Sequence, residues 1–399
     1  MKALQVQRSL ARFAAARLAS GARAGAGARY GPLTMADIEP PSLPGPGWQR
    51  IYPRLSGICG SDLATVDGRS SRWFEPIVSF PFVPGHEIVA STEDGHRVVV
   101  EPVLGCEARG ISPMCPACAQ GRRRHCLNLT AGHLSPGLQT GFCETTGGGW
   151  SLALVAHSSQ LHTVPDALAD EAAVLVEPAA CAVHAALTPV PSAPSDPASP
   201  LAVVIGAGAL GLLTIAALRM FRPGLGQLIA VAKHPHQRSL AHQLGATSVV
   251  GPGELRRAVR RASGGWVLDN GQLSGGAPLV FDCVGSPVSL ADALAVTAPG
   301  GALVLAGMPG PARADLTPLW QREISLTGSY TYGPEPLAGG RHSFDLAAQM
   351  AGELGLERLL SATYPLERSA DAISHAAEAG RRAAVKVAFD MRAEKKPSI

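Results

Sequence analysis

The stretch from Leu201 to Leu218, LAVVIGAGALGLLTIAAL, constrains the fold more than any other part of the sequence. A continuous apolar run typical of a buried strand leads into a G-x-G-x-x-G turn, and an apolar helical pattern follows at once. The first glycine permits a tight turn, the second lets a pyrophosphate approach the backbone, and the third lets the helix pack on the strand. The helix N-terminus then offers unpaired N–H groups to phosphates. The sequence therefore predicts a dinucleotide site formed by Gly206, Gly208, Ala209, Leu210 and Gly211.

The end of the next strand indicates which dinucleotide to expect. An Asp or Glu there would accept hydrogen bonds from the adenosine ribose hydroxyls, but Ala232 occupies that place. The cationic or titratable residues that follow are Lys233, His234, His236 and Arg238. A pocket that has lost an anion and gained cations suits a 2′-phosphate, so we expect NADP rather than NAD, bound by Lys233 and Arg238. The alternative is that these cations merely face solvent at a helix start.

The sequence pattern changes around residues 188–200, TPVPSAPSDPASP, whose proline and serine content is typical of a surface connection. Before it, short β-like runs with glycine and proline punctuation predict an all-β, barrel-like domain. After it, strands alternate with helical patterns, which predicts βαβ units and a parallel sheet. A closing strand–helix–strand pattern could rejoin the first domain. We therefore expect domains over 1–187 and 188–331 and a return of the chain over 332–399.

Charge and cysteine usage narrow the class of protein. The formal net charge of +3 is spread along the chain, so no nucleic-acid partner is expected. Glycines interrupt the uncharged stretch over 201–218, so no membrane span is expected either. Four of the eight cysteines lie between Cys106 and Cys126, a density that indicates metal in a reducing compartment. Residues 1–36 are rich in arginine, as in some transit peptides, but MKALQV already predicts a strand, and we expect a cytoplasmic protein.

Cys106, Cys115, Cys118 and Cys126 predict a closed metal site. The Cys115-x2-Cys118 turn lets two thiolates reach one ion, and the other two cysteines complete the set. Four thiolates satisfy tetrahedral zinc and leave no open position, so this lobe, over about residues 103–130, is expected to be structural. A nucleic-acid zinc finger is the weaker alternative, because no helix with base-reading side chains follows.

A second, scattered set of residues has the chemistry of a catalytic zinc site. Cys59 lies in GICGSD, His86 in PGHE and Glu177 in VEPAACAVHA. One sulfur, one imidazole and one carboxylate make three protein ligands and leave the fourth position for substrate or water. Each residue alone is ordinary, since a lone buried cysteine is usually packing. Their combination with a dinucleotide loop is what favours a catalytic role.

In their order along the chain, these motifs resemble the medium-chain dehydrogenase/reductase superfamily, in its zinc-dependent alcohol and polyol dehydrogenase branch. The matching runs are MKALQV, GICGSD, PGHE, the cysteine lobe, VEPAACAVHA, VVIGAGALG, FDCVGS, GGALVLAGM and SLTGS. The resemblance implies an α/β plus β architecture, with a GroES-like catalytic domain built from both ends of the chain and an inserted Rossmann coenzyme domain. It also implies hydride transfer between NAD(P) and an alcohol, with polyols, sugars or amino alcohols favoured.

The resemblance also implies roles for individual residues. Cys59, His86 and Glu177 match the ligands of the catalytic zinc, and Cys181 is the alternative third ligand. Relatives of this kind commonly form homodimers or homotetramers.

Three neighbours of these ligands match further roles in the family. Glu87 matches a carboxylate that can tune or transiently bind the metal, and Asp62 a partner that orients the histidine ligand. Ser61 is placed to take the hydroxyl proton of the substrate. Together with the zinc ligands, these residues form the predicted catalytic site.

The sequence departs from the family pattern at three places. Ser112 stands where relatives carry the first cysteine of the structural lobe, so Cys106 would have to supply that thiolate through a longer loop. Residues 8–30 insert an arginine- and alanine-rich stretch after the first strand, without an evident function. Ala64 occupies a place where relatives often carry a proton-relaying histidine.

Two other classes of function are compatible with part of the sequence. A zinc-free quinone or enoyl reductase of the same superfamily would keep the glycine loop but would lack Cys59 and the cysteine lobe. A non-catalytic, nucleotide-binding relative with only structural zinc would lack one of the catalytic ligands. All of these residues are present, so both alternatives rank behind a zinc dehydrogenase.

Overall fold

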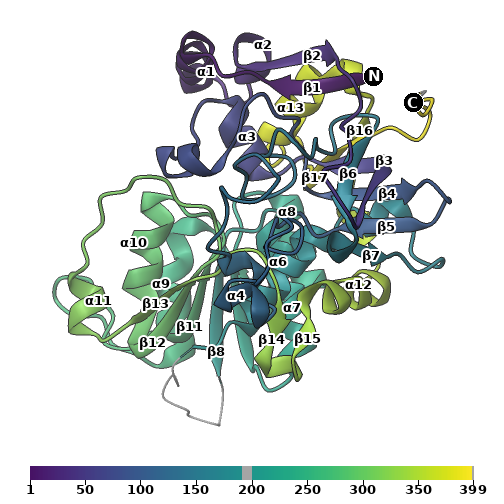
Figure 1. Cartoon of the computed structure of the whole chain (residues 1–399). Coiled ribbons are helices and arrows are strands. Elements are labelled where there is room, and N and C mark those ends of the chain that lie inside the picture. The colour runs from purple at the N-terminus through teal and green to yellow at the C-terminus, as the bar shows by residue number, and fades with distance from the viewer. Residues whose placement is uncertain (191–199, 398–399) are drawn as a thin grey trace. The chain divides into compact units, whose positions relative to one another are not determined.

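The fold is described from a computed structural model of the chain, which covers residues 1–190 and 200–397 (Figure 1). The described chain divides into two compact units. Unit 1 comprises Met1–Glu177 with Ala351–Ile399, and unit 2 comprises Pro178–Met350. Most of the expected connection over 188–200 lies outside the described residues, and the domain boundaries inferred from the sequence stay predictions.

Unit 1 is built mainly from strands. Its strands are β1 (Lys2–Val6), β2 (Leu33–Asp37), β3 (Trp48–Gly57), β4 (Ile88–Thr92), β5 (Arg97–Val100), β6 (Leu154–His157), β7 (Leu161–Thr163), β16 (Leu360–Tyr364) and β17 (Lys386–Asp390). Its α-helices are α1 (Leu10–Ala22), α2 (Gly27–Tyr30), α3 (Gly60–Val66), α4 (Pro116–Ala119), α5 (Asp170–Ala173) and α13 (Ser369–Ala377). Two further helices, α6 (Val176–Leu187) and α12 (Ser343–Leu354), continue across the division between the units.

Strand β3 organises the main sheet of unit 1, whose order is β16-β17-β3-β4-β5-β7 with β6 also paired to β3. The register between β3 and β4 shifts at Pro53, where the missing N–H favours a bulge. Trp150 is fully buried and donates its indole N–H to the carbonyl oxygen of Gly57 at 3.3 Å. Its ring packs edge-on against Phe389, with 5.0 Å between the centroids. The end of β3 is therefore fixed by both sheet pairing and core packing.

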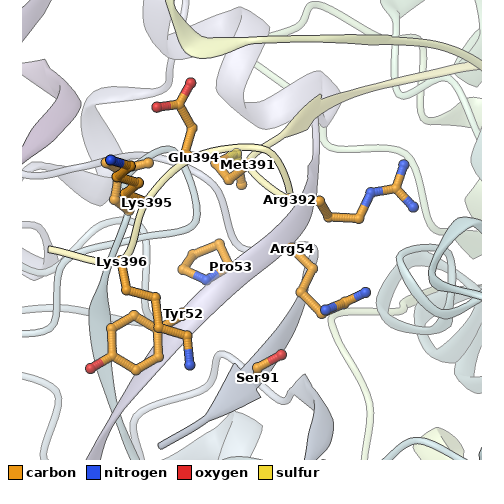
Figure 2. Close-up of a pocket in the computed structure, with 10 residues that line it drawn as sticks. Tyr52, Pro53, Arg54, Ser91, Met391, Arg392, Glu394, Lys395 and Lys396 are labelled. Atoms are coloured by element: carbon orange, nitrogen blue, oxygen red, sulfur yellow. The ribbon is translucent and has the colours of Figure 1, made fainter. Parts of the chain in front are cut away.

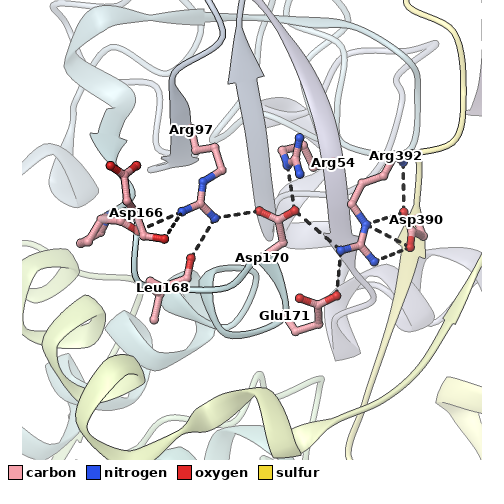
Figure 3. Close-up of polar contacts among 9 residues, drawn as sticks. Arg54, Arg97, Asp166, Leu168, Asp170, Glu171, Asp390 and Arg392 are labelled. Carbon is pink, nitrogen blue, oxygen red and sulfur yellow. Dashed lines mark hydrogen bonds and ion pairs between the residues drawn. The ribbon is translucent and has the colours of Figure 1, made fainter.

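A charged cluster ties the end of the chain to earlier parts of unit 1 (Figure 3). Asp170, at the start of α5, is 5% exposed and lies 2.8 Å from Arg54 of β3 and 3.2 Å from Arg97 of β5. Arg392 follows β17 and pairs with Glu171 at 2.7 Å. Arg392 also lies 3.7 Å from Asp170. Because three guanidinium groups share one buried carboxylate, Asp170 links β3, β5 and the segment after β17 to the start of α5.

Unit 2 has the alternating pattern of a parallel α/β domain. Its strands are β8 (Leu201–Ile205), β9 (Gln227–Val231), β10 (Ser248–Val250), β11 (Ala277–Asp282), β12 (Thr297–Leu305), β13 (Ser325–Gly328), β14 (Pro334–Glu335) and β15 (Arg341–His342). Its α-helices are α7 (Ala209–Phe221), α8 (Pro235–Gln243), α9 (Leu255–Ser263), α10 (Pro287–Val296) and α11 (Thr317–Gln321). The strands of the main sheet run parallel in the order β10-β9-β8-β11-β12-β13.

The strand order of this sheet reverses direction at β8, because β9 and β10 lie on one side of it and β11 to β13 on the other. In open α/β sheets, ligands bind beyond the carboxyl ends of the strands at such a point. The parallel second part is confirmed, and the first part is built around a β-sheet as expected, although helices such as α1 and α13 mean that it is not all-β. The uncharged stretch over 201–218 forms β8 and most of α7, and no helix among the described residues is long and apolar enough to cross a membrane.

We predict that Asp170→Ala destabilises the protein by about 2 kcal/mol, because Arg54 and Arg97 lose the carboxylate that they share. Urea unfolding followed by fluorescence measures this change. Asp166→Ala is the matched control, since Asp166 is exposed and accepts from Arg97 only through its backbone carbonyl. Equal effects of both substitutions would contradict the role given to Asp170.

Candidate functional site

The glycine loop that follows β8 has the geometry expected of a phosphate-binding turn. Gly206 has a φ of +95°, a conformation that side chains with a Cβ rarely adopt. A Cβ on Gly211 would lie 1.8 Å from the carbonyl oxygen of Gly206, so the third glycine permits the close packing of helix on strand. A Cβ on Gly208, the N-cap of α7, would meet nothing within 4 Å. The middle glycine thus faces open space at a helix N-terminus, with the N–H groups of Ala209 and Leu210 beginning the helix.

The cations predicted to recognise a 2′-phosphate lie at the same edge of the sheet, just beyond β9. Ala232 is buried, and Lys233 and Arg238 are exposed. Arg238 Nε donates to the carbonyl oxygen of Ala232 at 3.2 Å, which holds its guanidinium beside the end of the strand. The rings of His234 and His236 stack with 6.0 Å between centroids. Because β9 pairs directly with β8, these residues flank the glycine loop.

The four cysteines of the lobe converge as expected. Their sulfurs all lie within 4.8 Å of one another, and the Cys106–Cys126 distance is 3.7 Å. Tetrahedral Zn²⁺ with bonds of about 2.3 Å requires sulfurs roughly 3.8 Å apart, so the donor set fits zinc. Cys106 does supply the fourth thiol despite its longer loop, since its sulfur belongs to this group. That sulfur also accepts a hydrogen bond from the backbone N–H of Cys115 at 3.4 Å.

The protonation behaviour of these thiols also fits a metal site. The pKa of Cys115 falls to about 6, because burial, which raises it, is outweighed by the N–H groups of Leu127 and Cys118 and by neighbouring thiols. Burial and neighbouring sulfurs raise the pKa values of Cys118 and Cys126. Four thiolates in so small a volume repel one another, and a divalent cation removes that repulsion.

Two residues that the sequence analysis missed support the lobe. Arg109 is fully buried and donates to the carbonyl oxygens of Leu104 at 3.2 Å, Ala131 at 3.0 Å and Gly137 at 2.5 Å. Asn128 Nδ2 donates to Cys106 Sγ at 3.2 Å. An arginine between two ligand cysteines was the available signal for Arg109, but its carbonyl partners depend on the folded loop.

A second potential metal group brings together Cys59, His86 and Glu87, whose ligand atoms lie within 4.8 Å of one another. His86 and Glu87 are buried. Asp62 Oδ1 lies 3.4 Å from His86 Nδ1, which leaves Nε2 as the nitrogen for a metal. Burial lowers the pKa of His86, but Asp62 and Cys59 outweigh it and hold that pKa well above its ordinary value. A sulfur, an imidazole and a carboxylate in one place suit zinc.

Glu87 is held by a lysine that sequence reasoning missed. Lys386 Nζ lies 2.5 and 2.6 Å from the two carboxylate oxygens of Glu87, and Lys386 is only 4% exposed. Gly57 makes room for this pair, because a Cβ there would lie 1.9 Å from Glu87 Oε2. The signal in the sequence was a lysine within an otherwise apolar strand, KVAF. A buried charge of this kind is retained only when it is paired.

Glu177, the predicted third ligand, is buried at the start of α6 but does not belong to the compact group of Cys59, His86 and Glu87. Its charge nevertheless acts on Lys386, the lysine that holds Glu87. Burial lowers the pKa of Lys386, but the charges of Glu87, Cys59 and Glu177 together raise it above its ordinary value. Glu177 as a ligand, and Cys181 as its alternative, stay predictions.

The residues expected to handle the proton lie on the short helix α3. Cys59 is the N-cap of this helix, and Asp62 Oδ2 accepts from the backbone N–H of Cys59 at 2.9 Å. Ser61 lies in the first turn, and its carbonyl oxygen accepts from Thr65 Oγ1 at 3.0 Å. Ser61 and Asp62 are therefore one turn from a candidate metal ligand. Their catalytic roles remain predictions.

A small cavity of about 90 Å³ lies elsewhere in unit 1 (Figure 2). Its lining includes Tyr52, Arg54 and Lys396, and Lys396 Nζ lies 4.4 Å from the centre of the Tyr52 ring. Figure 2 shows Lys396 beside this ring, with Lys395 next to it in the chain but further from the ring. The cavity contains none of the predicted site residues.

Two protein-family models match the chain. The alcohol dehydrogenase GroES-like domain matches residues 45–166, and the zinc-binding dehydrogenase model matches residues 209–344. Together they cover more than half of the sequence. The first model includes the Cys59 and cysteine-lobe groups, and the second begins within the glycine loop.

Known proteins and structures resemble the chain over most of its length. A sorbitol dehydrogenase from Bacillus subtilis is 28% identical over 333 residues, covering 80% of this chain and 84% of that protein. A D-xylulose reductase A from Aspergillus oryzae is 26% identical over 344 residues, covering 82% and 86%. The crystal structure of 2R,3R-butanediol dehydrogenase from Bacillus subtilis has a TM-score of 0.68 at 22% identity and covers 98% of this chain and 99% of that one. This last likeness establishes the fold.

We predict that purified protein contains about two zinc ions per chain and that Cys118→Ser lowers this to about one. The substitution should also lower the midpoint of thermal unfolding by roughly 5 to 10 °C, because the lobe loses the metal that orders it. Elemental analysis and calorimetry measure both effects. Cys143→Ala is the control, since Cys143 is buried in the same unit but lies outside the cluster. Unchanged zinc content in Cys118→Ser would count against the lobe as a zinc site.

Proposed function

Because the chain belongs to the family of zinc-dependent alcohol and polyol dehydrogenases, it is an NAD(P)-dependent oxidoreductase, and we propose that it oxidises a polyol, sugar or amino alcohol with NADP as the preferred cofactor. The observation that carries this proposal is the convergence of Cys59, His86 and a carboxylate in one buried place. A zinc-free reductase has no use for that group, and a purely structural zinc protein needs only the four-cysteine lobe.

The preference for a polyol rests on the donor set and on the relatives. A carboxylate as third ligand, Glu177, favours polyhydroxylated substrates by resemblance, and the relatives named above act on sorbitol or xylulose by name. We also propose a cytoplasmic location, because the eight cysteines form no disulfide among the described residues, and a homodimer or homotetramer, as in the family.

The charges of the site support a divalent cation there. Cys59, Glu87 and Glu177 are negative when ionised, and all three act electrostatically on one cation, Lys386. Lys386 supplies one positive charge against these three groups, and charge left unbalanced in a buried environment is costly. Zn²⁺ held by Cys59, His86 and Glu177 would supply the missing charge and the Lewis acidity that makes a substrate hydroxyl acidic near neutral pH.

The chain's own residues then have separate tasks. Ser61 takes the hydroxyl proton, Asp62 holds the imidazole of His86 by its Nδ1, and Lys386 holds Glu87. The glycine loop of unit 2 binds the dinucleotide pyrophosphate, and Lys233 and Arg238 bind the 2′-phosphate. A bound dinucleotide would supply the hydride acceptor, and the protein supplies orientation and charge.

We predict that Glu177→Ala abolishes turnover and removes about one zinc ion per chain, because a catalytic site with two remaining ligands loses its metal. Cys181→Ala removes a thiol one turn further along the same helix. It should leave turnover and zinc content nearly unchanged. Initial rates and elemental analysis check the pair. The reverse result, with loss in Cys181→Ala only, would assign the ligand to Cys181.

We predict a higher kcat/KM with NADP than with NAD when sorbitol, xylitol and 2,3-butanediol are screened in parallel. Lys233→Ala and Arg238→Ala should each raise the KM for NADP about tenfold and leave the KM for NAD nearly unchanged, because only the 2′-phosphate loses a partner. A preference for NAD in the wild-type enzyme would overturn the cofactor assignment. Absence of oxidation with every alcohol and both cofactors would overturn the proposed function itself.

A further inference from the structure

The arginine- and alanine-rich segment of residues 8–30 has no task in the chemistry described so far. It leaves the sheet after β1 and returns at β2, and these two strands pair antiparallel, with Val6 opposite Leu33. Between them the segment folds into α1 and α2. Two of its buried positions, Ser20 and Gly27, lie against the end of α3, the helix that carries Ser61 and Asp62.

The strongest contact is made by Asp67, the C-cap residue of α3, which is 4% exposed. Its Oδ2 accepts from the backbone N–H of Gly25 at 2.9 Å, and its Oδ1 accepts from that of Gly27 at 3.0 Å. Both carboxylate oxygens are thus satisfied by the inserted segment. Hydrogen bonds to an ionised group are stronger than neutral ones, so this is a firm connection.

A second contact joins α1 to the same place. Ser20 is buried, and its hydroxyl lies 3.2 Å from the carbonyl oxygen of Asp67. Arg69 Nε donates to Ser20 Oγ at 3.0 Å, and a terminal nitrogen of Arg69 donates to the Ser20 carbonyl oxygen. Ser20 therefore contacts both Asp67 and Arg69, the residues that follow α3.

The fit between the segment and α3 leaves no room for side chains. A Cβ on Gly27 would lie 2.1 Å from the carbonyl oxygen of Val66, the last residue of α3. Gly25 has a φ of +80°, and a Cβ there would lie 2.8 Å from Ala377 Cβ of α13. The backbone of the segment is packed directly between the two helices. Arg23 adds an ion pair to Glu378, just after α13, at 2.9 Å.

Helix α3 needs such support, because it is too short to be stable by itself. A helix of two turns has marginal intrinsic stability, so its orientation is set by what contacts its ends. Its N-terminal end is fixed by Cys59 and Asp62. Its C-terminal end is fixed by Asp67 and the inserted segment. A loosened C-terminal end would let Ser61 and Asp62 shift relative to the substrate oxygen and to His86.

We propose that residues 8–30 form a brace for α3 and that Asp67 is a positioning residue of the reaction, which acts through Ser61 and Asp62 without touching substrate. This inference rests on the proposed function. It gives the inserted segment a catalytic purpose, and it predicts that damage to the brace affects the rate of turnover rather than the binding of the dinucleotide.

Asp67→Ala and Asp67→Asn in the zinc-loaded enzyme test the brace. We expect kcat, measured with the polyol that the wild type oxidises fastest, to fall about tenfold in Asp67→Ala and less in Asp67→Asn, which can still accept one of the two N–H bonds. The KM for NADP and the zinc content should stay within twofold of the wild type. Hydrogen–deuterium exchange of the peptide over residues 60–67 should become at least about tenfold faster in Asp67→Ala.

The exposed side of α1 offers the matched control. Leu18 is 80% exposed and Arg12 is also exposed, so Leu18→Ala and Arg12→Ala change the segment without touching α3. Both should keep wild-type kcat and wild-type exchange over residues 60–67. Should Asp67→Ala fail to fold, Gly27→Ala and replacement of residues 8–31 by an Asn-Gly turn test the same contact, because the turn can still connect β1 to β2.

The results separate this proposal from the proposed function. Unchanged kcat, or unchanged exchange over residues 60–67, in folded brace variants would overturn the brace proposal. Polyol oxidation by the wild-type protein would still support the proposed function. Wild-type protein that oxidises no alcohol would overturn the enzyme, and the exchange measurements would still report whether the segment holds α3. A rate loss that also appears in Leu18→Ala would show a general destabilisation and so contradict the proposal.

Discussion

The buried ion pair between Lys386 and Glu87 is the interaction on which the metal-binding part of unit 1 depends. It joins residues 299 positions apart in the sequence, because β17 pairs with β3 and places Lys386 beside the start of the GICGSD segment. A lone carboxylate at this depth would be neutralised by protonation. Lys386 places a positive charge directly beside Glu87, and Cys59 and Glu177 also act electrostatically on this lysine. The return of the chain to the first sheet is thus an electrostatic requirement as well as a topological one.

The sequence predicts features that are local in the chain. The glycine loop after β8 was readable because each glycine has a steric task within a few residues, and the convergence of four cysteines followed from donor chemistry despite Ser112. The residues after β9 likewise indicated a cationic edge, since Lys233 and Arg238 follow shortly after Ala232 in the sequence. These signals depend on backbone turns and on ligand number, which short windows of sequence contain.

Contacts between distant segments could not be predicted in the same way. Lys386 stood out as a lysine within an apolar strand and Arg109 as an arginine between two ligand cysteines, yet their partners are set by the folded sheet and loop. The brace formed by residues 8–30 gave only a compositional signal, since backbone N–H groups of Gly25 and Gly27 form its main bonds. The fold shows that Glu177 is buried and that its charge acts on Lys386. Its role as a zinc ligand stays a prediction.

Arg109 has a consequence for the chemistry of the cysteine lobe. Burial lowers the pKa of this guanidinium, and the sulfurs of Cys143, Cys126 and Cys106 oppose that effect, so its charge acts on the cluster. Zinc bound by four thiolates carries two net negative charges, which makes its sulfurs electron-rich and open to attack by electrophiles. The fixed positive charge of Arg109 acts electrostatically on Cys106 and Cys126, and it offsets part of this negative charge. The lobe should therefore resist oxidants and alkylating reagents better than its count of thiolates suggests.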